Sequence, residues 1–155
     1  MKSKKELIEE LSQSMQRSGT LTVLHTNAVA DKIGISATEF ESMDIISHHQ
    51  PMSAGHLAMR CGLTTGAITG IVDRLERAGL VKRVRDPEDR RRVLLRPVEN
   101  ETKKRKVREL YQPMSHAFDE LMGECTPEQI RFLVDIHNKM NDRVEKIISQ
   151  LREQY

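Results

Sequence analysis

The chain has 155 residues, 37% of them hydrophobic, which suffices for one domain with helical extensions. Two cysteines are too few for a disulfide framework, and no run approaches the ~20 apolar residues of a membrane span. The N-terminus lacks the apolar segment of a signal peptide, so we expect a cytoplasmic protein without membrane contact.

The net charge is only +2, but the basic residues are unevenly distributed. Between Lys82 and Arg96 there are seven basic and three acidic residues, a local charge of +4. The rest of the chain has 18 basic and 20 acidic residues, a charge of −2. Such a concentrated positive segment indicates a nucleic-acid partner.

The N-terminal region has a helical pattern. Leu7, Leu11 and Met15 recur every four residues and predict an amphipathic helix that continues past Gly19 to about Ala30.

A capping box, in which Ser36 is followed three residues later by Glu39, predicts a second helix. This helix should begin at Ala37 and run to about His48, before Pro51.

Two more N-cap residues follow, Ser53 and Thr64. The helix after Ser53 should be short because Gly62 can terminate it, and the helix over about 64–78 should stop at Gly79. The second of these helices has an apolar stripe made of Ile68, Ile71, Val72 and Leu75. Two short helices joined by a tight turn predict a helix-turn-helix, whose second helix enters the DNA major groove.

The second helix carries mostly small residues outside this stripe, including Gly66 and Gly70. A glycine inside a helix costs roughly 1 kcal/mol relative to alanine, which a purely structural surface has little reason to carry. Small side chains allow close approach to bases, and threonine can pack its methyl group on thymine. The alternative is an ordinary helical hairpin with a polar outer face.

A basic hairpin follows and argues against that alternative. Residues 80–85 and 92–96 are short Val/Leu/Arg runs, and the turn-forming sequence Asp86-Pro87-Glu88-Asp89 separates them. The pattern predicts two strands with a charged tip over about 80–96.

The C-terminal part should be helical. Pro97 suits the first turn of a helix running to about Met122, with a kink or break near Pro113. A second capping box, Thr126 to Gln129, starts the last helix, which should end near Arg152. Its heptad stripe contains one polar exception and consists of Ile130, Leu133, His137, Met140, Val144, Ile147 and Leu151. A stripe over three heptads favours a partner helix over packing within the monomer.

The segment Leu63–Val81, LTTGAITGIVDRLERAGLV, followed by Asp86–Val93, DPEDRRRV, resembles the MarR family of winged-helix transcription regulators. The matched motifs span roughly 52–95, and the layout of the flanking helices extends the resemblance over most of the chain. In one departure, Arg96-Pro97 stands where many members have Leu-Thr before the next helix.

The resemblance implies a mainly α fold with a small β-hairpin wing, flanked by N- and C-terminal dimerisation helices. It divides the chain into an N-terminal dimerisation helix (1–34), a DNA-binding lobe (35–97) and C-terminal dimerisation helices (98–155). It also suggests that Arg91 enters the minor groove.

The expected DNA-binding residues are Ser53, Thr64, Thr65, Gly66, Ala67, Thr69, Gly70, Arg74, Arg90, Arg91 and Arg92. The expected dimer-interface residues are Leu7, Leu11, Ile130, Leu133, Met140, Val144, Ile147 and Leu151.

We therefore predict a homodimeric repressor that binds a pseudo-palindromic operator in double-stranded DNA and is released by a small-molecule effector. The resemblance suggests small, often aromatic or anionic effectors, bound between the dimer helices and the DNA-binding lobes. The sequence identifies neither the effector nor its pocket. His25 is a candidate pocket residue, and the alternative is a partly buried polar side chain.

Other functions have less support in the sequence. No HxxxH or HExxH spacing occurs, so we expect no metal and no cofactor. No nucleophile elbow or phosphate loop occurs, so we expect no enzyme and no catalytic residues. Cys61 and Cys125 are interpreted as structural. The basic run 103–106 is interpreted as a solvated helix face, with a contact to the DNA backbone as the alternative. A metal- or redox-sensing variant and a winged-helix protein–protein module remain as alternatives.

Overall fold

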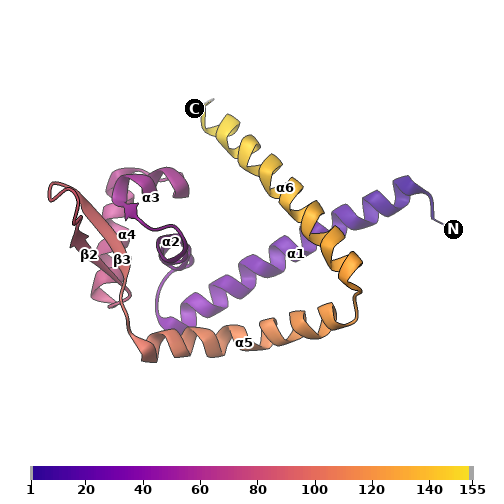
Figure 1. Ribbon diagram of the computed structural model, residues 1–155, viewed down its shortest axis with the longest axis horizontal. Coiled ribbons are helices and arrows are strands. Elements are labelled where there is room, and N and C mark those ends of the chain that lie inside the picture. Colours follow the sequence, from indigo (N-terminus) through magenta and orange to yellow (C-terminus); the bar gives the residue numbers. More distant parts are fainter. Residues whose placement is uncertain (1, 154–155) are drawn as a thin grey trace. The chain divides into compact units, whose positions relative to one another are not determined.

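The computed structural model describes residues 2–153 and divides into two compact units between Val107 and Arg108 (Figure 1). Its helices are α1 (Lys4–Ile33), α2 (Ala37–His48), α3 (Ala54–Cys61), α4 (Thr65–Arg77), α5 (Glu101–Gly123) and α6 (Pro127–Glu153). Its strands are β1 (Met52–Ser53), β2 (Val81–Arg85) and β3 (Val93–Pro97). This mainly α architecture with a small antiparallel sheet confirms the predicted fold class. In the described part of the chain, no helix is both long and apolar enough to traverse a bilayer.

The helix starts follow the capping residues. The Ser36 hydroxyl accepts a hydrogen bond from Glu39 N at 3.3 Å, while the Glu39 carboxylate accepts one from Ser36 N at 2.8 Å. In the second box the Thr126 hydroxyl accepts from Gln129 N at 3.3 Å, and the Gln129 side-chain oxygen accepts from Thr126 N at 2.7 Å. These bonds satisfy N–H groups that have no partner inside the helix, which confirms both predicted starts.

A third capping box was missed. Ser3 and Glu6 cap each other, so α1 begins at Lys4. It also extends beyond the predicted end near Ala30, because the helix stops only at Gly34, which has a φ of 79°. A left-handed conformation at this position favours glycine and closes the helix C-terminus.

The core of the first unit lies between α2, α3, α4 and the sheet (Figure 1). The predicted stripe of α4 is buried there, together with Phe40, Ile46, Met52, Leu57, Val81, Leu94 and Leu95. Only Val29 and Ala30 of α1 are buried, close to its contact with α2. Apart from Phe40, the large core side chains are Leu, Ile, Val and Met, as the composition predicts.

The sheet has the order β1-β3-β2. In the antiparallel hairpin Val81 pairs with Pro97 and Arg85 with Val93, which confirms the predicted wing strands. The third strand was not predicted. Met52 pairs with Leu95 and Ser53 with Leu94, but two residues are too few to show an alternating pattern.

Pro97 does not begin a helix, contrary to the prediction. It is the last residue of β3, and α5 begins only at Glu101, where the Asn100 side chain accepts a hydrogen bond from Lys103 N at 3.0 Å. Proline also suits a strand end, where its missing N–H does not interrupt the ladder. Of the predicted kink or break near Pro113, the break does not occur, because α5 is one helix from Glu101 to Gly123 with Pro113 inside it.

The second unit contains the rest of α5 and α6. None of its described side chains, residues 108–152, is buried. The predicted heptad stripe of α6 is among the exposed or half-exposed side chains.

Candidate nucleic-acid interface

The turn between α3 and α4 is held by local hydrogen bonds. The Ser53 hydroxyl caps α3 by accepting from His56 N at 3.2 Å, and the Thr64 hydroxyl caps α4 by accepting from Ala67 N at 3.2 Å. Between them Gly62 has a φ of 67°, and Leu63 N donates to Ala58 O at 3.0 Å. The predicted helix-turn-helix is thereby formed. The Ser53 and Thr64 side chains have a capping role whether or not they also touch DNA.

The outer face of α4 is open and lined by small residues. Thr65, Gly66, Ala67 and Thr69 are exposed, and Gly70 is half-buried. A Cβ atom added at Gly66 would meet nothing within 4 Å, so packing within the chain does not require glycine there. The Thr69 hydroxyl donates to Thr65 O at 2.9 Å, which leaves its methyl group and its oxygen lone pairs for an external partner.

Arg74 is held on the side of α4 that faces α2. Its Nε donates to the carboxylate of Glu39, which is buried, while the Arg74 side chain remains about half exposed. Burial alone would raise the pKa of Glu39, but hydrogen bonds from Arg74 and Ser36 outweigh this effect and lower the pKa. Glu39 is therefore ionised at neutral pH. The sequence pattern around Glu39 predicts only its capping role, because Arg74 is 35 residues away in the chain.

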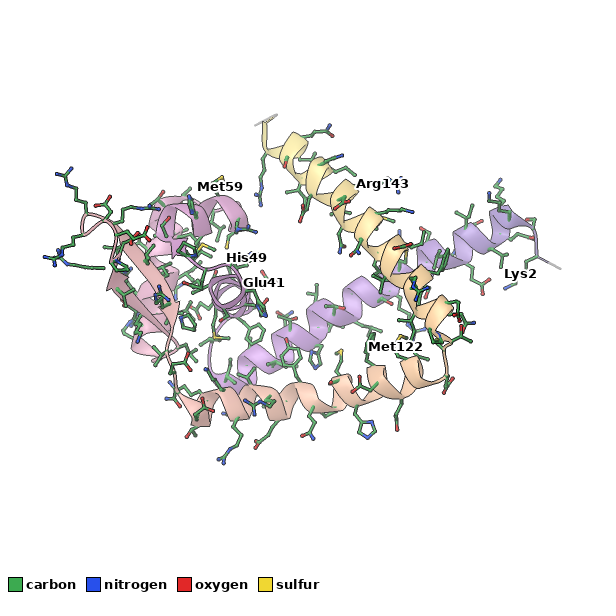
Figure 2. The ribbon with its side chains drawn as sticks, in the orientation of Figure 1. Lys2, Glu41, His49, Met59, Met122 and Arg143 are labelled. Atoms are coloured by element: carbon green, nitrogen blue, oxygen red, sulfur yellow. The ribbon has the colours of Figure 1, made fainter. Side chains whose placement is uncertain are left out.

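The tip of the hairpin is shaped by two aspartates. The Asp86 carboxylate accepts from Glu88 N at 2.9 Å and lies 3.9 Å from an Arg92 nitrogen, and the Asp89 carboxylate accepts from Arg91 N at 3.0 Å. Such bonds from Asp to the backbone two residues on stabilise tight turns. The nitrogen-bearing side chains at this tip project away from the lobe (Figure 2).

Not every arginine of the basic segment is available to a ligand. Arg83 forms ion pairs with Asp73 at 2.8 Å and with Glu76, so it joins β2 to α4. Burial by itself would lower the pKa of Arg83, but the hydrogen bonds and charges of these two acids outweigh burial and raise the pKa. Arg90 and Arg91 differ, because within residues 2–153 neither forms an ion pair and both are exposed. The wing tip thus offers two exposed arginines to a ligand, and Lys82, Arg85 and Arg96 on the strands are exposed as well.

The residues that the MarR family model matches are 35–93, which comprise this helix-turn-helix and most of the wing. Over 151 residues the chain is 36% identical to the uncharacterized HTH-type transcriptional regulator YcgE of Bacillus subtilis, and 97% of each chain is covered. The chain belongs to the MarR family of transcriptional regulators.

Solved structures show that the fold of this MarR-family chain is shared. A MarR family protein from Bacillus stearothermophilus has a TM-score of 0.69 at 19% identity, covering 93% of this chain and 99% of its own. Streptococcus pneumoniae FabT, solved in complex with DNA, has a TM-score of 0.67 at 19% identity, covering 90% and 99%.

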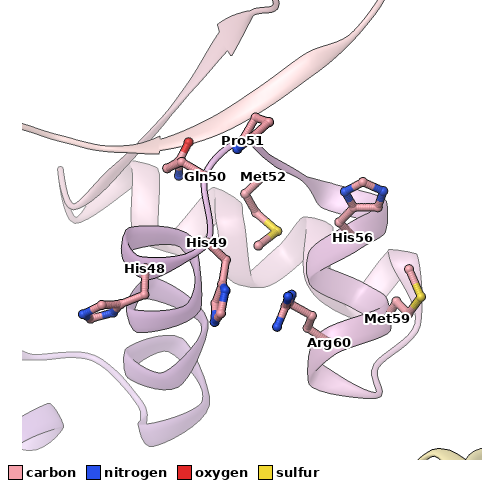
Figure 3. A pocket seen from close by; sticks show the side chains of 8 residues that line it. All are labelled: His48, His49, Gln50, Pro51, Met52, His56, Met59 and Arg60. Atoms are coloured by element: carbon pink, nitrogen blue, oxygen red, sulfur yellow. The ribbon is translucent and has the colours of Figure 1, made fainter.

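A surface pocket of about 440 Å³ lies between the end of α2 and α3 (Figure 3). Its lining residues are His48, His49, Gln50, Pro51, Met52, His56, Met59 and Arg60. His49 and Arg60 point toward each other below Met52, whereas the rings of His48 and His56 point away (Figure 3). No group of three or more His, Cys, Asp or Glu side chains in the described chain is arranged to hold a metal ion.

The two cysteines are free thiols in separate, half-buried environments. Ser42 already donates its hydroxyl hydrogen to Thr38 O at 2.7 Å, so in the 3.8 Å contact between Ser42 and Cys61 the thiol is the donor. The Cys125 thiol donates to Leu121 O at 3.7 Å. Both contacts suit structural thiols.

The basic run 103–106 is partly used for structure. Lys103 Nζ donates to Ala78 O at the end of α4, and Lys104 forms an ion pair with Glu99. The predicted solvated face is therefore wrong for Lys103, whose ammonium group is bound to the backbone. The bond could have been predicted from the helix end, because the carbonyl oxygen of the C-cap residue Ala78 has no partner within the helix and can accept from a cation.

Proposed function

We propose that the chain is a homodimeric repressor that binds a pseudo-palindromic operator in double-stranded DNA and is released by a small molecule. The observation that carries the proposal is the open, small-residue face of α4 beside a wing tip with two exposed arginines that form no ion pair in the described chain. With α4 in the major groove, Thr65, Gly66 and Thr69 would face base edges. The wing would place Arg91 at the narrow minor groove.

Dimerisation is supported by the apolar surfaces outside the lobe. Leu7 and Leu11 of α1 and the heptad residues of α6 are exposed or half-exposed in the single chain. The exposed apolar surface of α6 is wider than predicted and also includes Phe132, Ile136 and Ile148. A surface of this extent indicates an interface, and a second copy of the chain would also place two recognition helices on the two halves of a palindrome.

The proposal is tested by selecting bound sequences from random double-stranded DNA. We expect an inverted repeat to be enriched. FabT, which shares the fold, was solved with DNA, and this supports the expectation. A winged-helix module used for protein contacts would enrich no sequence, and that result would refute the proposal.

The roles within the interface can be separated on the selected operator. Thr65→Ala or Thr69→Ala should relax sequence preference by roughly 1–3 kcal/mol at the contacted positions. Arg91→Ala should instead weaken binding to many sequences and reduce the salt dependence. For wild type, about 6–10 phosphate contacts predict a loss of affinity of ~10³–10⁵ between 50 and 200 mM salt. If Arg91→Ala binds the operator with unchanged affinity, the proposed contact of Arg91 with the minor groove is wrong.

Release is tested by adding small aromatic carboxylates, such as benzoate, to the preformed operator complex. We expect at least one of them to lower operator affinity, since anionic or aromatic effectors are those that the family resemblance suggests. His25 lies half-buried on α1, so His25→Ala should reduce the effect of the effector if this side chain lines the pocket. Release that is identical in His25→Ala and wild type would make His25 a structural residue.

A further inference from the structure

Arg74 lies on the stripe of α4 that includes Gly66 and Gly70, eight and four residues before it, and Arg77 lies on the same side near the C-terminal end of the helix. Residues four apart share a helix face, and helical side chains lean toward the N-terminus. The structure shows this lean, because a Cβ atom added at Gly70 would lie 3.4 Å from Arg74 Nη1. The guanidinium therefore lies over Gly70, toward the end of α4 that is proposed to read DNA.

The Glu39 carboxylate fixes one part of this guanidinium. It accepts from Arg74 Nε, and its own position is set by Ser36, whose N–H donates to the same carboxylate at 2.8 Å. Within the described residues, no hydrogen bond engages the two terminal nitrogens of Arg74. Those nitrogens can supply the pair of N–H donors that bind O6 and N7 of guanine.

We propose that Glu39 is a positioning residue that orients Arg74 for bidentate recognition of a guanine in each operator half-site. The proposal rests on the DNA-reading role proposed above for α4. An unrestrained arginine loses side-chain entropy when it binds, and one already held by a carboxylate loses less. Glu39 would thus act on DNA only through Arg74, without touching it.

Glu39→Gln is a sharp test because glutamine also serves at this position of a capping box, so the start of α2 is kept. The change removes the negative charge that holds Arg74. The matched control is Ser36→Ala, which removes the cap of α2 but leaves the Glu39–Arg74 pair. Thermal unfolding of both variants establishes that each is folded before binding is measured.

The measurement is the affinity of each protein for the selected operator and for operators with every base pair of a half-site replaced in turn. In wild type, replacing the guanine read by Arg74 should lower affinity about 5- to 150-fold. Arg74→Ala should abolish discrimination at that base pair, and Arg74→Lys should reduce it because lysine lacks the planar fork. Glu39→Gln should reduce it at the same pair only, while Ser36→Ala should leave it unchanged.

The double variant Glu39→Gln/Arg74→Ala should match Arg74→Ala at that pair, since Glu39 has no effect without Arg74. Unchanged discrimination in Glu39→Gln, or a uniform loss of affinity across all operators in Arg74→Ala, would overturn the inference and leave the proposed function intact. If wild type selects no inverted repeat, the proposed function itself fails, and the positioning role fails with it.

Discussion

Helices α4 and α6 are both amphipathic, yet in the single chain the apolar stripe of α4 is buried and that of α6 is exposed. Ile68, Ile71, Val72 and Leu75 of α4 are between 0% and 5% exposed. Leu133, Met140, Val144, Ile147 and Leu151 of α6 are between 36% and 54% exposed. The α4 stripe has α2, α3 and β2 to pack against. The lobe therefore supplies its own core, whereas α6 leaves its apolar face exposed in the single chain.

The largest effect is expected from a charge on the α6 stripe. Val144→Asp should dissociate the proposed dimer, because an unpaired charge at an apolar interface is strongly unfavourable. Loss of bivalent binding should lower operator affinity by roughly 10²–10⁴-fold. Sedimentation velocity and operator binding measure the two effects. The control variant Ser149→Asp adds the same charge on the opposite face of α6 and should stay dimeric. A wild-type protein that is monomeric at micromolar concentration would contradict the proposed dimer.

Shortening a buried side chain of the lobe should instead lower the stability of the folded state. Leu75→Ala should lower the free energy of unfolding by about 2–5 kcal/mol, because Leu75 is completely buried. The loss should persist in the monomeric Val144→Asp background, whereas Ile147→Ala should cost almost nothing there. Urea denaturation of the two double variants provides the measurement. Equal losses for Leu75→Ala and Ile147→Ala would show that α6 packs within its own chain.

A smaller effect should separate stability from DNA binding on α4 itself. Gly66→Ala should stabilise the folded state by about 0.5–1 kcal/mol, because alanine is the better helix former and the added methyl group meets no atom within 4 Å. The same methyl group should weaken operator binding if bases approach closely. Gly19→Ala in α1 is the matched control, since its methyl group also meets nothing within 4 Å. It should raise the thermal midpoint without changing operator affinity.

The smallest expected effect is a pH dependence of the lobe. The pKa of Glu39 is lowered in the folded chain, so its ionised form adds stability above the unfolded-state pKa, and this is lost as pH falls through the folded-state pKa. Wild type should therefore lose more stability than Glu39→Gln between neutral and strongly acidic pH. Denaturant titrations of both proteins at several pH values measure the difference. Parallel pH profiles would mean that the Glu39–Arg74 pair contributes nothing to folding.

The predicted boundaries held where they depended on local chemistry. Ser36, Thr64 and Thr126 begin helices because a side-chain oxygen meets a backbone N–H a few residues away, and Gly62 ends one because it adopts a positive φ. Pro97 was wrongly assigned because proline suits both the first turn of a helix and the end of a strand, and only pairing with Val81 decides between them.

Much of the candidate site was visible in the chain itself, because exposed small residues on α4 and a run of arginines are properties of neighbouring residues. The tertiary structure decided which charges are already paired. Arg83 binds Asp73 and Glu76, and Arg74 binds Glu39, 35 residues earlier in the chain. It also showed that Met52 and Ser53 form a third strand with β3. Such partners are distant in sequence, and only folding brings them within hydrogen-bonding distance; local patterns determine helices and turns, whereas ion pairs and strand neighbours depend on the whole lobe.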